Sequence, residues 1–301
     1  MWSYSSSYVQ QLRRTRENVK FLPGVAIPLS VRFTADFAEA WDGAQVLVVA
    51  VPSQYLRGVL KMAGTGPWDR VLVVSVVKGV EPETLLRMSE VVRQMVPAKR
   101  LAVLSGPSIS YETARGVPTT VVAASKESAA ARQVQELFST NQFRVYTSSD
   151  VIGVELGGAL KNVIAIACGV ADGLGFGANA KAALVTRGLV EMARLGTAMG
   201  ARAKTFTGLS GLGDLVTTCI SEHSRNRRVG EQLGRGVPLA AITGTTEQVA
   251  EGIVTAQSAY ALSRKHRVQM PIATAVYEIL YKGKSPKRAV ADLMSRDLKS
   301  E

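Results

Sequence analysis

The chain of 301 residues is 47% hydrophobic and 20% charged, a composition that can bury a sizeable core and excludes general intrinsic disorder. Its 36 Lys and Arg residues against 24 Asp and Glu residues give a formal net charge of +12, which favours acidic partners. Aromatic residues make up only 6% of the chain and are not interleaved with basic runs, so a phosphorylated small molecule is favoured over nucleic acid.

Apolar runs, the N-terminal residues and the cysteines bear on the location of the protein. Residues 163–171 and similar runs fall short of the 18 or more apolar residues expected of a membrane span. Residues 1–7 lack the basic and apolar regions of a secretory signal, so we expect a cytoplasmic protein. Cys168 and Cys219 lie among apolar or small residues, which favours buried thiols, and with only two His residues we expect no metal site.

The first half of the chain alternates between short β-branched runs and helical patterns. The runs are nearly continuous in apolar character, as in strands buried on both faces of a parallel sheet. Strands are predicted over residues 46–51, 71–77, 101–104, 119–123 and 143–146, and helices over residues 54–63, 84–95 and 126–139. This order predicts a doubly wound, Rossmann-like α/β domain over residues 1–148.

After Asp150 the β-branched runs disappear and long helical patterns replace them. Helices are predicted over residues 151–169, 178–199, 227–234 and 246–265. The second domain, residues 149–301, is therefore expected to be all-helical.

Three junctions just after predicted strands are candidates for ligand binding, because ligands of open α/β sheets bind at the carboxyl ends of strands. Ser53 follows the first strand, where a helix N-cap is the simpler reading. Lys78 follows the second beside Gly79, which allows close backbone approach, and could hold a phosphate or carbonyl oxygen or be merely solvated. Residues 105–110 follow the third, with small side chains that fit either a capped turn or a ligand site.

The start of the second domain places a lysine among small residues. Helical spacing puts Gly157, Gly158 and Ala165 on the face of Lys161. Each glycine costs a helix about 1 kcal/mol relative to alanine, so either a cleared ligand site or close helix packing must compensate. Close packing does not explain a lysine in an apolar stretch, whereas a buried lysine of lowered pKa can act as a general acid or base.

Two later segments also carry polar chemistry. The glycine-rich residues 208–213 lead to Asp214, which either caps a helix or presents a carboxylate to a site. Ser224, Arg225 and Asn226 combine a capping hydroxyl, a cation and an amide at a predicted helix start, the outline of an anion site. A solvated basic turn is the alternative for this segment.

Together these segments resemble the bacterial type of NAD(P)-dependent glycerol-3-phosphate dehydrogenase. The resemblance runs from about Trp2 to the C-terminus and is carried by ordered motifs. The segments that carry it are residues 18–24, 50–53, 78–79, 105–108, 153–165, 172–179, 208–215 and 224–227. It implies a Rossmann domain, a helical domain, and interconversion of dihydroxyacetone phosphate and sn-glycerol 3-phosphate for glycerophospholipid synthesis.

The resemblance assigns roles to individual residues. Lys161 corresponds to the catalytic proton donor and acceptor. The positions that match substrate-binding residues are Lys78, Gly106, Ser108, Lys161, Asp214, Ser224, Arg225 and Asn226. The positions that match cofactor contacts are Tyr4, Lys78, Ser110, Arg225, Val249 and Glu251. The implied cofactor is NADP or NAD, the implied partner is a phosphorylated small molecule, and a homodimer is one option for the assembly.

One departure from the family concerns its first strand, G-x-G-x-x-[GA] turn and helix, which the chain lacks. Residues 173–177 and 208–213 are rich in glycine but follow no β run. The departure favours a 5′-truncated reading frame or a misassigned start, and it leaves a catalytically impaired family member or a non-catalytic binding protein as alternatives. Another hydroxy-acid dehydrogenase of the same architecture is a further alternative.

The residues near the end of the family's second strand bear on the choice of cofactor. NAD enzymes carry an acidic residue there, but this chain has Tyr4 and neighbouring serines, and its first carboxylate is Glu17. Arg13, Arg14 or Arg16 could attract a 2′-phosphate, so we expect a preference for NADP with NAD tolerated.

Overall fold

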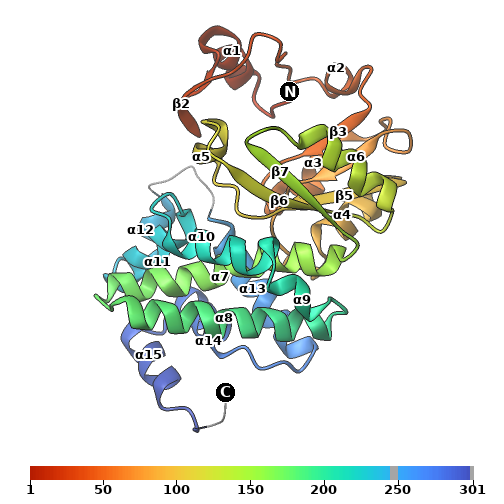
Figure 1. Cartoon of the computed structure of the whole chain (residues 1–301). Coiled ribbons are helices and arrows are strands. Elements are labelled where there is room, and N and C mark those ends of the chain that lie inside the picture. Colours follow the sequence, from red (N-terminus) through yellow and green to blue (C-terminus); the bar gives the residue numbers. More distant parts are fainter. Residues whose placement is uncertain (245–249, 299–301) are drawn as a thin grey trace.

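An α/β region and a helical region make up the chain, and the structure, a computed structural model, describes residues 1–244 and 250–298 of it (Figure 1). The elements of the α/β region are α1 (Ser6–Thr15), β1 (Glu17–Asn18), β2 (Leu22–Ala26), α2 (Phe37–Trp41), β3 (Val46–Val49), the 3-10 helix η1 (Ser53–Tyr55), α3 (Leu56–Ala63), β4 (Leu72–Ser75), α4 (Met88–Met95), β5 (Arg100–Ser105), α5 (Ser110–Ala114), β6 (Thr119–Ala124), α6 (Ser128–Phe138) and β7 (Phe143–Ser148). All five strands predicted in this region are confirmed.

The main sheet has five strands in the order β3-β4-β5-β6-β7. Strands β3, β4 and β5 are parallel, but β5 and β6 are antiparallel, with Val103 opposite Ala124, and β6 and β7 are again parallel. The prediction of an all-parallel sheet was therefore wrong at one junction. The link from β5 to β6 contains only the five-residue α5, and not the longer helix that usually crosses over between parallel strands.

Helices cover both faces of this sheet, as the doubly wound prediction required. Successive residues of a strand point to opposite faces, so Val73 packs with α3 and α4 while Leu72 and Val74 pack with α6. Strand β4 is buried along its whole length. The Rossmann-like class of the fold is confirmed.

Residues 1–36 form a separate N-terminal unit with its own small core. Trp2 pairs with Thr34 in a parallel bridge outside the five-stranded sheet, and Val9, Leu12 and Phe33 are buried together. The ring of Trp2 stacks on the ring of Phe37 in α2, with ring centroids 4.3 Å apart. This contact connects the N-terminal unit to the rest of the α/β region.

The helical region surrounds one long central helix (Figure 1). Its elements are α7 (Val151–Gly173), α8 (Ala178–Ala198), α9 (Ala203–Phe206), the π-helical turn η2 (Leu209–Gly213), α10 (Asp214–Ile220), α11 (Arg225–Gly234), α12 (Leu239–Gly244), α13 (Glu251–Lys265), α14 (Pro271–Tyr281) and α15 (Pro286–Met294). The predicted helical character is confirmed, and the boundary at 148/149 stays a prediction. Of the helix predicted over residues 246–265, residues 246–249 lie outside the described part of the chain.

The central helix α7 is longer and more apolar than the sequence pattern suggested. Its 23 residues have the length and mean hydropathy of a membrane-crossing helix, although Glu155 and Lys161 interrupt its apolar run. However, 89% of its most apolar window is buried inside the structure, where other helices cover it. An apolar helix covered on all sides is the expected core of a large helical region.

Two pairs of glycines bring α11 against α7. Gly169 and Gly173 of α7 face Gly230 and Gly234 of α11, and a Cβ on any of them would collide with the backbone of the other helix. Small residues four positions apart let helix backbones approach closely, and this contact fixes the position of α11 relative to α7. The start of α11 carries Ser224, Arg225 and Asn226.

The helix predicted over residues 84–95 begins later than expected, at Met88. Leu85 has a φ of 60°, in the left-handed region, and Val80 pairs with Arg87 in an antiparallel bridge. These features form a loop between β4 and α4, which bears on the position of Lys78.

Candidate active site

The site lies where the carboxyl ends of β3, β4 and β5 meet helices α7, α10 and α13. The strands lead to Ser53, Lys78 and Gly106, and the helices contribute Lys161, Asp214 and Glu251. Hydrogen bonds connect the two sets, because Lys78 contacts both Gly106 and Asp214. The structure therefore brings together residues predicted from both halves of the chain.

Lys161 is the most buried cation of this cluster, with 6% of its surface exposed. Its Nζ donates to Oδ1 of Asp214 at 2.6 Å and to Oγ1 of Thr218 at 2.7 Å. Burial lowers the pKa of Lys161 to about 8, and the charge of Lys78 adds to this effect while Asp214 opposes it. The side chain can therefore gain or lose a proton near neutral pH, as a general acid or base must.

Asp214 is shared between two lysines. Nζ of Lys78 donates to its Oδ2 at 2.6 Å, while Lys161 occupies its Oδ1. Burial opposes ionisation of this carboxyl, but the two lysines outweigh burial and lower the pKa of Asp214. The carboxylate is thus a fixed anion rather than the helix cap that the sequence also allowed.

Thr218 is a site residue that the sequence analysis missed. Its hydroxyl donates to the carbonyl oxygen of Asp214 at 2.6 Å and accepts from Lys161, so it fixes the direction of the ammonium group. The spacing of four residues from Asp214 within one helix was the available signal, since such residues share a helix face.

The two glycines before Lys161 have different neighbours. A Cβ on Gly157 would collide with the backbone of Ser210, which is close packing. A Cβ on Gly158 would lie 2.6 Å from Oγ of Ser105 and 3.5 Å from Cγ of Lys78, so its absence makes room for site residues. Close packing is therefore confirmed for both glycines, and the ligand site around Lys161 stays a prediction.

Gly106 and Ser108 occupy the turn after β5. Gly106 has a φ of 147°, and a Cβ there would lie 2.9 Å from Cα of Val121. Its carbonyl accepts from Lys78 at 3.0 Å and from Oγ of Ser108 at 3.1 Å. Next to it, Oγ of Ser105 is buried without a hydrogen-bond partner among the described residues, so a polar partner is available to a ligand.

The predicted anion site lies at the start of α11. Oγ of Ser224 accepts from the backbone N–H of Arg227 at 3.3 Å, which makes Ser224 the N-cap. Arg225 is exposed, and its charge reaches Glu251. The combination of a helix N-terminus with a cation suits a phosphate.

Asn226 contributes to this segment by connecting helices. Its Nδ2 donates to Oδ1 of Asn162 at 2.9 Å, and its Oδ1 accepts from the backbone N–H of Gly252 at 2.9 Å. Asn226 thus joins α11 to α7 and α13 and holds Arg225 in place. Asn162 is a second residue that the sequence analysis missed.

Glu251 begins α13 and connects the helical region to the strand side of the site. The backbone N–H of Ser53 faces its carboxylate and favours the ionised form. Burial raises the pKa of Glu251, although the charges of Lys78, Lys161 and Arg225 oppose the rise. The prediction that Ser53 caps the next helix was wrong, because its side chain makes no capping bond and Pro52 is the N-cap residue.

The other predicted cofactor contacts are either exposed side chains away from Lys161 or lie outside the described residues. Tyr4 belongs to the N-terminal unit and is 75% exposed, and Ser110 is exposed at the start of α5. Neither shares a hydrogen bond with the cluster around Lys161 within residues 1–244 and 250–298. Val249 lies outside the described residues.

The arginines expected near a 2′-phosphate are engaged within the N-terminal unit. Arg13 donates to the carbonyl of Phe33 from Nε at 3.0 Å and Nη2 at 2.7 Å. Arg16 donates to the carbonyls of Pro28 and Val31 and lies over the ring of Phe33. Arg14 is exposed on the same helix.

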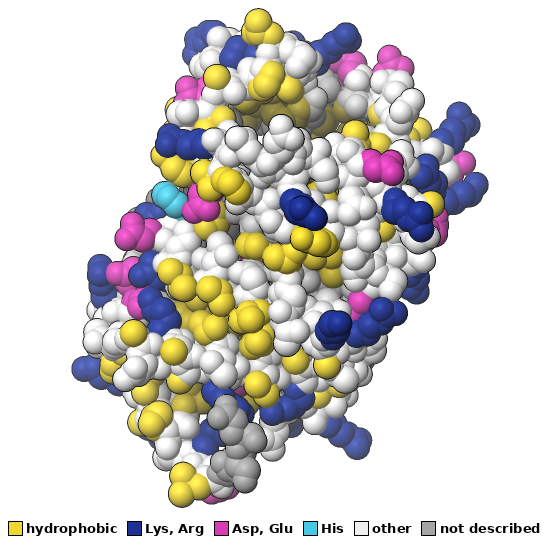
Figure 2. Space-filling view, viewed as in Figure 1, with side chains coloured by type: hydrophobic (Ala, Val, Ile, Leu, Met, Phe, Trp, Pro, Cys, Tyr) yellow, Lys and Arg dark blue, Asp and Glu magenta, His cyan; other side chains and the backbone are white. Residues whose placement is uncertain are grey.

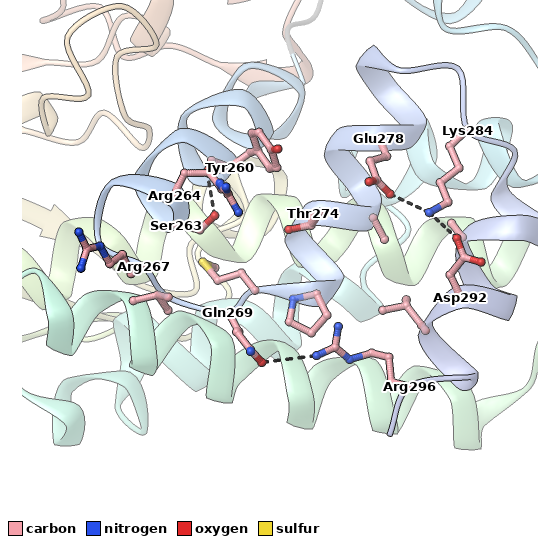
Figure 3. Close-up of a pocket in the computed structure, with 16 residues that line it drawn as sticks. Tyr260, Ser263, Arg264, Arg267, Gln269, Thr274, Glu278, Lys284, Asp292 and Arg296 are labelled. Atoms are coloured by element: carbon pink, nitrogen blue, oxygen red, sulfur yellow. Dashed lines mark hydrogen bonds and ion pairs between the residues drawn. The ribbon is translucent and has the colours of Figure 1, made fainter. Parts of the chain in front are cut away.

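A hollow of about 740 Å³ lies away from this site, between α13, α14 and α15 (Figure 3). Arg264, Arg267 and Arg296 lie around it, and Lys284 binds Glu278 and Asp292 at one side. None of the predicted site residues lines it.

On the face shown in Figure 2, Lys and Arg side chains are spread over both the upper and the lower part of the molecule. Nucleic-acid binding generally uses a basic stripe on one face, and this face shows none. The described part of the chain contains no group of three or more His, Cys, Asp and Glu residues suited to a metal ion. Cys168 and Cys219 are free and buried.

Comparison with known proteins decides the family. The sequence model described as NAD-dependent glycerol-3-phosphate dehydrogenase N-terminus matches residues 1–131, and the one described as its C-terminus matches residues 150–291. The chain belongs to the NAD-dependent glycerol-3-phosphate dehydrogenase family. The family resemblance of the sequence motifs is thereby confirmed.

Individual relatives of this dehydrogenase family agree over the whole chain. Glycerol-3-phosphate dehydrogenase [NAD(P)+] of Citrifermentans bemidjiense is 50% identical over 304 residues, which cover 100% of this chain and 91% of the relative. The Bacillus pumilus protein of the same name is 48% identical and covers 98% of this chain and 87% of its own. A crystal structure of glycerol-3-phosphate dehydrogenase from Coxiella burnetii superposes with a TM-score of 0.92 at 37% identity, over 98% of this chain and 90% of that one.

Proposed function

We propose that the chain is an NAD(P)-dependent oxidoreductase that reduces dihydroxyacetone phosphate to sn-glycerol 3-phosphate, a precursor of glycerophospholipids. One observation carries the proposal: buried Lys161 shares the carboxylate of Asp214 with Lys78 at the carboxyl ends of the strands. Relatives about 50% identical over the whole chain are named for this activity. The site thus holds two cations and one fixed anion at the place where an α/β fold binds its ligands.

We expect the reacting end of the dinucleotide at the turns that follow β3, β4 and β5. Gly79 and Gly106 let these turns pack closely, because a Cβ on Gly79 would lie 2.6 Å from the side chain of Ser53 and one on Gly106 would lie 2.9 Å from Cα of Val121. Ser53, Lys78 and Glu251 would line the nicotinamide, which supplies the hydride when bound in reduced form. Within residues 1–244 and 250–298 no G-x-G-x-x-G turn follows a strand, so no residues are assigned to the pyrophosphate.

Lys161 donates the proton in the proposed reduction. As hydride reaches the carbonyl carbon, the ammonium group of Lys161 transfers a proton to the carbonyl oxygen, which becomes the C2 hydroxyl. Lys161 is left neutral, and a proton from water restores it. In the oxidative direction neutral Lys161 accepts the hydroxyl proton. A pKa of about 8 keeps both forms accessible at neutral pH.

The neighbours of Lys161 prepare this step. The cation of Lys78 stabilises negative charge that develops on the oxygen, and Asp214 keeps both lysines in place. The helix start at Ser224 and Arg225 would hold the phosphate of the substrate, with Asn226 fixing the position of that helix. The substrate is thereby oriented with its carbonyl toward Lys161.

The remaining expectations concern the domain bounds, the cofactor contacts, the location and the assembly of the protein. We propose an NAD(P)-binding domain over residues 1–148 and a substrate domain over residues 149–301, with their interface at the site. Tyr4, Ser110 and Val249 keep the cofactor role that the family resemblance implies. The protein is proposed to act in the cytoplasm on a phosphorylated small molecule, without nucleic acid, and a homodimer is the assembly to test.

The direct test is oxidation of NADPH by the purified chain with and without dihydroxyacetone phosphate. We expect oxidation that depends on the substrate and that is lost in Lys161→Ala but kept in Lys181→Ala, a lysine that pairs with Asp172 outside the site. A folded chain that oxidises NADPH only with unphosphorylated ketones, or not at all, would contradict the proposal. Circular dichroism of each sample establishes that it is folded.

A further inference from the structure

The loop between β4 and α4 carries Lys78 at its start and is held by the helical region at two points. The first is Val80, whose carbonyl accepts from Oγ of Ser258 of α13 at 2.8 Å. Ser258 is fully buried, so this bond is protected from water. Val80 also pairs with Arg87 in an antiparallel bridge, so the bond to Ser258 restrains both ends of the loop.

The second point is a buried carboxylate, Glu155, which precedes Lys161 on α7. Oε1 of Glu155 accepts from the backbone N–H of Ser89 at 2.7 Å, and Oε2 accepts from its hydroxyl at 2.7 Å. Oε2 also forms an ion pair with Arg87. Burial raises the pKa of Glu155, while Arg87 and Ser89 oppose the rise. A buried carboxylate is costly unless it is paired, and Glu155 is paired with Arg87 and Ser89. The start of α4 could be capped by a residue of its own segment, so a partner from α7 points to a further role.

These contacts bear on Lys78 because they tie the ends of its loop to the helical region, whereas the middle of the loop is held from the α/β side by the ion pair of Glu81 with Arg57 of α3. Leu85 has a left-handed φ of 60°, and the loop surface at Glu83 and Thr84 is exposed. On its other side, Lys78 donates to Asp214 and to the carbonyl of Gly106. Loss of the two contacts with the helical region is expected to let the ends of the loop shift, so that Lys78 loses this geometry.

We infer that Glu155, assisted by Ser258, is a positioning residue that holds the loop of residues 78–87 so that Lys78 stays on Asp214. The inference rests on the proposed function for its kinetic readout. Glu155 does not touch the reacting groups; it acts through Arg87 at the end of the loop and Ser89 at the start of α4.

A shift of the loop should change the pKa of Lys161. Three groups act on its charge: Lys78 from the loop, Asp214 from α10 and Glu251 from α13. Cys219 of α10 is also near, but burial and Cys168 raise the pKa of its thiol and keep it neutral. Lys78 lowers the pKa of Lys161, and Asp214 raises it. If the loop shifts, Lys78 moves away from Lys161 and no longer pairs with Asp214. The carboxylate of Asp214 then pairs with Lys161 and not with Lys78. Both changes move the pKa of Lys161 upward from about 8.

The test compares Glu155→Gln with Glu191→Gln. Glu191 is a matched control, because it is also a buried carboxylate that accepts backbone N–H groups at a helix start, those of Ile272 and Ala273. We expect Glu155→Gln to lower kcat by about tenfold to 100-fold, the range for a misplaced site group, with a smaller change in KM. Glu191→Gln should leave kcat and KM near the wild-type values.

The discriminating readout is the ionisation of Lys161 in the ligand-free protein. It is followed by the pH dependence of the lysine ¹³Cε resonance, which needs no catalytic activity. Glu155→Gln and, more weakly, Ser258→Ala should raise the pKa of Lys161, and Glu155→Asp should restore part of the wild-type value. In a Lys78→Ala background Glu155→Gln should add no further rise.

Two results would overturn the inference. One is an unchanged pKa of Lys161 in folded Glu155→Gln or, should that variant not fold, in Ser258→Ala. The other is an equal rise with and without Lys78, which would mean that Glu155 acts on Lys161 through another route. An inactive wild-type chain would count against the proposed function alone, because the resonance reports on Lys161 independently.

Discussion

The helical region and the N-terminal unit differ in what their charged side chains do. In the helical region Lys161, Asp214 and Thr218 are buried and bonded to one another. In the N-terminal unit Arg13 and Arg16 bind backbone carbonyls of the unit itself, and Tyr4 is 75% exposed. The difference shows that the groups of the proposed proton transfer are already held in place by the protein, whereas the proposed role of the N-terminal unit in cofactor choice depends on exposed side chains.

The largest effect is expected from Lys161→Ala, which removes the proton donor. General acid catalysis contributes about 10²-fold to 10⁴-fold, so kcat should fall within that range while the KM for dihydroxyacetone phosphate changes little. Steady-state kinetics at several substrate concentrations separate the two constants. Turnover that survives nearly intact would place the proton donor elsewhere.

The next effect is expected from Asp214→Asn. Asp214 raises the pKa of Lys161, so its neutralisation should lower that pKa below about 8, and reduction should then fail at a lower pH. We expect a loss of about tenfold to 100-fold in kcat, since both lysines lose their anchor. The matched control is Asp172→Asn, a carboxylate that also binds two cations, Lys181 and Arg227. A pH profile that moves equally in both variants would refute the role of Asp214.

A structural effect is expected from Gly169→Ala. Its Cβ would collide with the backbone of Arg227, so α11 must move away from α7, at a cost of about 1–3 kcal/mol in the free energy of unfolding. Gly58→Ala is the control, because Gly58 lies in a helix with open space around it and the change should be stabilising. Urea unfolding of both variants measures the difference. Equal stabilities would contradict the close packing of α7 and α11.

The smallest effect concerns the N-terminal unit and the cofactor. No carboxylate lies near Tyr4 in the sequence to repel a 2′-phosphate, so kcat/KM should be higher with NADPH than with NADH. Because Arg13 and Arg16 already bind carbonyls, Arg14→Glu should reduce the preference more than a charge change at the distant Arg235. Equal or better efficiency with NADH would remove the expectation.

Local patterns predicted the parts of the molecule that depend on neighbouring residues. The strands, the long helices and the lysine beside Gly157 and Gly158 follow from periodicity and from the cost of glycine in a helix. The motifs also marked Asp214 as a carboxylate of interest, although its partners were unknown. The family resemblance added the roles of Lys78 and Glu251.

Features that depend on distant contacts were not predictable in this way. The antiparallel direction of β6 follows from how the short link after β5 returns, which no pattern within β6 records. The roles of Thr218 and Glu155 depend on which helices and loops they face. Ser53 looked like a helix cap because its own neighbours suit that role, whereas its N–H faces Glu251 from the other region.

The most direct test of the account is the pH dependence of kcat/KM for reduction of dihydroxyacetone phosphate by NADPH. If Lys161 donates the proton, the rate should be constant at neutral pH and fall about tenfold per pH unit above about 8, the pKa of Lys161. Enzyme stability at each pH is checked by returning samples to neutral pH before assay. A rate that stays constant through pH values well above 8 would contradict the assignment of Lys161 as the proton donor.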